Sequence, residues 1–100
     1  MKKLEQKYIK MNYKYLIYFS DELDGRSYKV GDENSKIIIN RLFENLNIQS
    51  FTYDKTKTII IVVTTKRLDM GIFNSKQNSL QLKFKSGLTI RPYILSEITL

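Results

Sequence analysis

The chain has 100 residues and a formal net charge of +7, and it contains neither cysteine nor histidine. This length suits one domain, and 42% hydrophobic residues are enough for one compact core. The missing residue types exclude disulfides, nucleophilic sites that need histidine, and the usual zinc sites. We therefore expect a binding protein without a cofactor or resident metal.

The N-terminal residues 1–12 predict a basic arm, followed by a single domain over residues 13–100. Met11 is an alternative start to Met1. Lysines begin the chain, but the apolar stretch Tyr15–Phe19 is short and no small-residue cleavage site follows it, so we expect no signal peptide. No apolar run approaches the roughly 20 residues of a membrane span. We expect a protein of the cytoplasm or of an organelle interior, with no membrane insertion.

The first predicted strand, Tyr13–Phe19, is rich in aromatic and aliphatic residues. One face carries Tyr13, Tyr15, Ile17 and Phe19, and the other carries Lys14, Leu16 and Tyr18. Two interpretations of the tyrosines are open. In the first, the tyrosines stack on the bases of a single-stranded nucleic acid while neighbouring lysines pair with its phosphates. Lysines alternate with tyrosines in this way at Lys7-Tyr8 and around Lys10 and Lys14. The face shared with Ile17 favours a core role instead.

A polar connector, Ser20–Gly31, separates this strand from the main predicted helix, and within it Arg26–Val30 predicts at most a short extended piece. Asp24-Gly25 indicates a turn, and the nearby acids lack the alternating ligands of a calcium loop. Asp32–Ser35 offers several N-caps. The apolar residues that follow have helical spacing, namely Ile38, Ile39, Leu42, Phe43 and Leu46. We expect this helix to end near Asn45–Asn47 and to cover one face of a sheet.

Two more strands are predicted at Ser50–Tyr53 and Thr58–Thr65, joined by a tight turn over residues 54–57. The run Ile59–Val63 is apolar on both faces, so we expect a central strand with the helix over one side and other side chains over the second. Residues 66–79 show no clean period. Gly71 and the polar run after it predict a connector with at most a short strand or a single turn.

Residues 80–92 predict a hairpin with a defined register. A two-residue turn would mix apolar and polar side chains on each face. A three-residue loop, Lys85-Ser86-Gly87, pairs Leu82 with Ile90 and Phe84 with Leu88, and it puts Gly87 where a left-handed residue closes the loop. The polar face then collects Gln81, Lys83, Thr89 and Arg91. Pro92 cannot donate a ladder hydrogen bond, so its strand should lie at an edge or end there.

These elements predict an α+β fold in which a mostly antiparallel sheet of four to five strands packs on one main helix, in the order β-α-β-β-β-β. The order of Tyr15–Phe19, the helix from Ser35, Thr58–Thr65 and Leu80–Ile90 resembles that of the S-ten family of small-subunit ribosomal proteins. The resemblance concerns element order alone, so it assigns no site residues. It implies an RNA-binding body.

Positive charge is concentrated in residues 1–20, with five lysines against one acid, and in residues 49–100, with eight basic against three acidic residues. Such a distribution attracts polyanions. We therefore expect a non-catalytic protein that binds RNA or another polyanion, as a component of a translation or other ribonucleoprotein assembly. The expected phosphate contacts are Lys83, Lys85, Arg91, Lys55, Lys57, Lys66, Arg67, Lys10 and Lys14.

Two other functions stay open. A small virus-, phage- or plasmid-encoded protein can bind and inhibit a host protein through an exposed strand edge, and the alanine-free composition, rich in lysine, isoleucine and asparagine, suits AT-rich coding of that kind. A histidine-free ribonuclease toxin would depend on lysine, arginine and tyrosine, with Lys83 and Arg91 as candidates. A magnesium nuclease would need converging carboxylates to hold the metal, and Gln81, the residue near Lys83 in such a pattern, has an amide side chain instead.

Overall fold

The computed structural model describes residues 11–21 and 25–100. The basic arm predicted for residues 1–12 therefore lies outside the described residues, apart from its last two. The described elements are β1 (Tyr13–Ser20), β2 (Ser27–Tyr28), α2 (Asp32–Leu42), β3 (Ile48–Tyr53), β4 (Ile59–Thr64), α3 (Met70–Lys76), the 3-10 helix η1 (Gln77–Leu80), β5 (Leu82–Lys83) and β6 (Thr89–Thr99).

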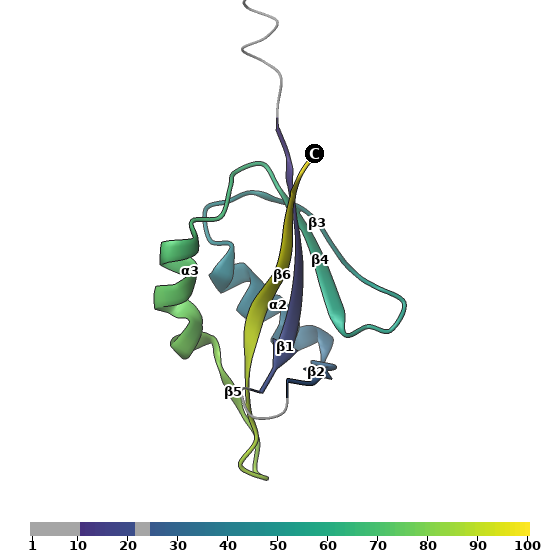
Figure 1. Cartoon of the computed structure of the whole chain (residues 1–100), viewed down its shortest axis with the longest axis vertical. Helices are drawn as coiled ribbons and strands as arrows, with labels where there is room; N and C mark the ends of the chain where they lie inside the picture. The colour runs from purple at the N-terminus through teal and green to yellow at the C-terminus, as the bar shows by residue number, and fades with distance from the viewer. Residues whose placement is uncertain (1–10, 22–24) are drawn as a thin grey trace, which may run out of the picture.

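The strands form one curled antiparallel sheet in the order β3-β4-β1-β6-β5, and β2 pairs with the end of β1 (Figure 1). The predicted α+β class is confirmed. β4 lies between β3 and β1, so its predicted central position is correct. The structure adds two elements to the predicted order. One is the short β2, which lies within the extended piece predicted at Arg26–Val30, and the other is a helix before the last hairpin.

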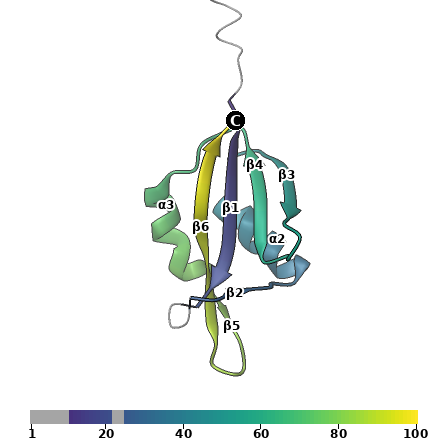
Figure 2. The same ribbon diagram turned by 45° about the vertical axis from the view of Figure 1, so that its right-hand side comes forward.

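The last hairpin has the predicted register. Leu82 pairs with Ile90, and the Phe84 N–H donates to the Leu88 carbonyl at 2.8 Å. The Gly87 N–H donates to the Phe84 carbonyl at 3.0 Å, and Gly87 has φ +90°, which favours glycine. This hairpin projects beyond the rest of the sheet (Figures 1 and 2).

Pro92 lies within β6 and does not end it, because the strand continues to Thr99. The pairing with β5 stops at Ile90, so β6 is an edge strand from there on, as the proline predicted. The Gln77 side chain donates to the Pro92 carbonyl at 3.0 Å and so satisfies one backbone group of that edge.

The segment predicted as a connector, residues 66–79, contains α3 and the start of η1. The prediction missed a local cap. The Asp69 carboxylate accepts the N–H groups of Gly71 and Ile72, at 2.8 and 3.2 Å. A Cβ at Gly71 would approach that carboxylate to 3.1 Å, so the glycine that argued against a helix leaves room for its cap. Phe73 anchors the short helix in the core.

Helix α2 differs from its prediction at both ends. Its N-cap is Gly31, without a side-chain hydrogen bond, while Asp32 and Glu33 occupy the first turn. Ser35, an expected cap, is buried inside the helix and donates to the Val30 carbonyl at 3.1 Å. The helix ends at Leu42 rather than near Asn45–Asn47, because Asn45 and Asn47 have φ of 66° and 55° and turn the chain toward β3.

The uncapped start of α2 gives a first prediction. Replacing Gly31 by serine should raise the free energy of unfolding by about 0.5 kcal/mol, because a serine hydroxyl accepts a free N–H of the first turn. Gly31 has φ −56°, and a Cβ there meets no atom within 4 Å. Urea denaturation measures the effect. Gly31→Ala is the control, and an equal gain from alanine would attribute the effect to the unfolded chain rather than to the cap.

The core lies between the sheet and the helices. From the strands it takes Tyr15, Ile17, Phe19, Ile60, Val62 and Ile90, and from the helices and loops Ile38, Ile39, Leu42, Phe43, Leu68, Phe73 and Leu80. The predicted face of β1 is confirmed, and so is the helical stripe as far as Phe43, whereas Leu46 lies beyond the helix and is only partly buried. Tyr15 is fully buried and Tyr13 is half-buried, so the core interpretation of these tyrosines is correct.

Candidate nucleic-acid interface

The two faces of the sheet have different surroundings. Along β4, Ile60, Val62 and Thr64 are buried, whereas the alternating Ile59, Ile61 and Val63 are half-exposed. Residues of α2 and α3 belong to the same cluster as the buried set, so both helices cover one face. Figure 2 turns the strands toward the viewer, with α2 behind them. No described element covers the other face, which contradicts the expectation that side chains cover both sides of this strand.

We call this uncovered surface the open face. Strand register defines it: Leu16 is opposite both Ile61 and Ser96, and Tyr18 is opposite both Ile59 and Tyr93. Its members include Lys14, Leu16 and Tyr18 of β1, Ser50 and Thr52 of β3, Ile59, Ile61 and Val63 of β4, Lys83 of β5, and Thr89, Arg91, Tyr93, Ser96 and Ile98 of β6. It therefore combines an aliphatic and aromatic centre with basic ends.

The two tyrosines at the centre form an aromatic pair. The rings of Tyr18 and Tyr93 lie 5.5 Å apart between centroids, with an interplanar angle of 24°, so they stack. Both side chains are half-exposed. Sequence reasoning placed Tyr18 on the correct face of its strand but did not pair it with Tyr93. Such a pairing depends on the register between the first and last strands, which are far apart in the sequence.

A β-bulge lies next to the aromatic pair. The register between β1 and β6 shifts between Leu16 and Ile17, whose partners are Ser96 and Ile94, so Leu95 is the extra residue. Its side chain is 55% exposed. Bulges increase the local twist of a strand and redirect side chains, and here the bulge adds an exposed apolar side chain beside the open face.

Basic side chains lie at both ends of the open face. Lys14 is opposite Val63 and Ile98 at one end, and Lys83 and Arg91 lie at the other. Arg91 and Ile98 are roughly 20 Å apart at the usual rise of a strand. Arg91 is held by a hydrogen bond to the Gln81 side chain at 3.1 Å. None of the open-face positions carries a carboxylate, so their charge is uniformly positive.

The other basic residues predicted to contact phosphate are not brought to one place. Lys55 and Lys57 lie in the turn between β3 and β4, and Lys66 follows β4 at its far end. Lys85 is exposed in the hairpin loop next to Lys83. Arg67 is paired with Glu97, at 3.0 Å between Nη2 and Oε1. Lys10 lies outside the described residues.

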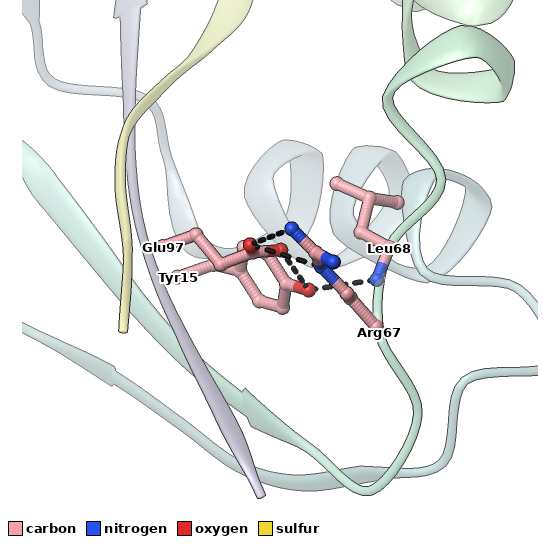
Figure 3. Close-up of polar contacts among 4 residues, drawn as sticks. All are labelled: Tyr15, Arg67, Leu68 and Glu97. Atoms are coloured by element: carbon pink, nitrogen blue, oxygen red, sulfur yellow. Dashed lines mark hydrogen bonds and ion pairs between the residues drawn. The ribbon is translucent and has the colours of Figure 1, made fainter. Parts of the chain in front are cut away.

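A polar cluster on the covered side of the sheet joins distant segments (Figure 3). We call Tyr15, Arg67, Leu68 and Glu97 the Tyr15 cluster. The Tyr15 hydroxyl donates to Glu97 Oε2 at 2.7 Å and accepts the Leu68 N–H at 2.7 Å. Burial raises the pKa of Tyr15 to about 12. The hydrogen bond from Arg67, supported by that from Tyr15, lowers the pKa of Glu97.

The Tyr15 cluster brings a glutamate together with a tyrosine and an arginine, two of the residue types on which the toxin hypothesis depends. Tyr15 is 0% exposed, and its hydroxyl already donates one hydrogen bond and accepts another, so the hydroxyl cannot reach a substrate. The cluster instead fastens β1 and β6 to the segment between β4 and α3. No set of three or more acidic side chains with metal-binding geometry occurs in the described part of the chain.

None of the helices described is long and apolar enough to cross a membrane. Comparison with family models, curated proteins and solved structures found no match for this chain. The open face is therefore the main basis for a functional hypothesis.

Proposed function

We propose that this protein binds RNA without catalysis, through the open face of its sheet. The observation that supports this proposal is an uncovered sheet face with lysine or arginine at both ends and no carboxylate at any of its positions. RNA is uniformly anionic, so a face of this charge attracts it over long distances and releases counterions on contact.

The side chains proposed to contact phosphate are Lys14 at one end of the open face and Lys83 and Arg91 at the other. Lys14 and Lys83 form no ion pair with other described residues, so they bind phosphate without losing a protein partner. Lys85 extends the basic end onto the hairpin loop. A component of a translation or other ribonucleoprotein assembly is the most concrete setting for such a protein, and RNA that co-purifies with it would support this setting.

Salt dependence tests the proposal. With three phosphate contacts, the slope of log affinity against log salt is about −2 for a single RNA strand, or roughly a 20-fold loss between 50 and 200 mM salt. The double variant Lys14→Gln, Lys83→Gln should reduce the slope to about −0.7, because each contact contributes about that amount. Fluorescence anisotropy with a labelled unstructured RNA measures both values.

The matched control is the double variant Lys36→Gln, Arg41→Gln, which removes the same charge from exposed positions of α2, behind the sheet. It should keep the slope of the original protein. A slope near zero in the original protein, or equal slopes in the two double variants, would reject binding through the open face.

The protein-binding alternative has one observation in its favour. β3 pairs only with β4, so among the described strands its other edge has no partner. A host-protein segment can add to such an edge as a further strand. A complex of this kind should keep its affinity in the double variant Lys14→Gln, Lys83→Gln, because main-chain pairing at the edge of β3 does not use the open-face lysines. Recovery of one stoichiometric protein partner, without RNA, would favour this alternative.

A further inference from the structure

We infer that the open face is specific for single-stranded RNA and stacks an unpaired base on the aromatic pair of Tyr18 and Tyr93. This inference rests on the proposed function and adds the class of RNA. The pair occupies β1 and β6, which are adjacent strands of the sheet, and it lies between the basic ends of the open face.

The geometry of the pair suits a base. The two rings are nearly parallel, with an interplanar angle of 24°, and their mutual contact fixes both orientations before a ligand arrives. A base that stacks on an outer ring surface extends an ordered stack, so little side-chain freedom is lost. Leu16 and Ile59 lie next to Tyr18 on the same face and offer apolar contact for sugars and base edges.

Duplex RNA does not match this arrangement. Its bases are stacked inside the helix, and proteins reach duplexes mainly through phosphates and 2′-hydroxyls. A site that needed only phosphates would have basic residues along its length, whereas here the centre is aromatic and aliphatic and the cations lie at the ends. A single-stranded RNA matches both regions of the face, since its bases contact the aromatic and aliphatic centre while its phosphates reach Lys14 and Lys83.

The tyrosine hydroxyls favour RNA over DNA. Neither the Tyr18 nor the Tyr93 hydroxyl forms a hydrogen bond with other described residues, so both are available to a ligand. The 2′-hydroxyl of ribose is a donor and an acceptor, and it is the group by which proteins distinguish RNA from DNA.

The test compares the original protein with the double variant Tyr18→Leu, Tyr93→Leu, which keeps apolar side chains and removes the rings. Affinity for a short single-stranded RNA should fall about 5- to 150-fold, the range for loss of stacking on one base. Affinity for a duplex of the same sequence should change less than about twofold, because no base stacks there. Single-stranded DNA should bind more weakly than RNA of the same sequence.

The matched control is Phe51→Leu, which removes a ring from the Phe51–Tyr53 pair on the covered face of β3 and should leave RNA affinity unchanged. Thermal unfolding confirms that each variant is folded at the assay temperature. Unchanged single-strand affinity in the Tyr18 and Tyr93 variant overturns base stacking but leaves the salt-dependent binding of the proposed function intact. Equal affinity for DNA overturns the assignment to RNA. If the original protein binds no RNA at low salt, the proposed function fails, and this inference fails with it.

Discussion

Replacing Ile60 by threonine should lower the free energy of unfolding by about 2–4 kcal/mol, whereas the same change at Ile61 should cost about 1 kcal/mol or less. The two residues are neighbours in β4. Ile60 lies on the face covered by the helices and is 2% exposed, whereas Ile61 lies on the open face and is half-exposed. Threonine keeps the β-branched shape, so strand propensity is little changed. The difference therefore measures burial, since only position 60 buries the new hydroxyl.

Urea denaturation of both variants provides the measurement. The dependence of the unfolding free energy on urea concentration should be the same in both, which excludes a change in the unfolded state. Ile59→Thr is a second open-face variant and should behave like the change at Ile61, because it has the same orientation in the strand. Equal, large losses at positions 60 and 61 would mean that something covers the open face in solution. Stability that depends on protein concentration would then identify a second copy as the cover.

Local patterns predicted much of the fold. The hairpin register followed from matching faces across a turn, and Gly87 adopts the expected positive φ. The apolar stripe of α2 and the two faces of β1 also followed from periodicity alone. Each of these features depends on residues that are close in the sequence, so the pattern contains the information.

The features that carry the candidate site depend on distant contacts. The run Ile59–Val63 is apolar on both faces and therefore predicted cover on both, but both described helices lie on one side of the sheet. Which face a helix covers depends on the path of the connections, which hydrophobic pattern does not encode. The aromatic pair joins residues 75 positions apart across a bulge, and Asp69 caps a helix too short for a periodic signal.

The Tyr15 cluster gives the second large expected effect. Tyr15→Phe should lower the free energy of unfolding by about 2–3 kcal/mol at neutral pH, because it leaves the buried Leu68 N–H without its acceptor and removes a hydrogen bond to a carboxylate. The hydroxyl joins residues separated by 82 and 53 positions, so its loss loosens β1 from both β6 and the segment after β4. Urea denaturation provides the measurement.

Two controls separate this effect from general perturbation. Tyr13→Phe changes the same residue type on the same face of β1, where the hydroxyl has no hydrogen bond with other described residues, and it should be nearly neutral. Arg67→Gln removes an ion pair whose arginine side chain is 69% exposed, so its cost should stay below about 1 kcal/mol. A loss from Arg67→Gln as large as that from Tyr15→Phe would assign the stabilisation to the ion pair.

The pH dependence of the Tyr15→Phe difference identifies the hydroxyl itself. Burial favours the neutral phenol, so the pKa of Tyr15 is about 12 in the folded protein against 10.0 for the free side chain. A raised folded pKa contributes stability that is complete below pH 10 and is lost as pH rises toward 12. The stability difference between the original protein and Tyr15→Phe should therefore shrink over this interval. A difference that stays constant from pH 9 to 12 would contradict a raised pKa of Tyr15 in the folded protein.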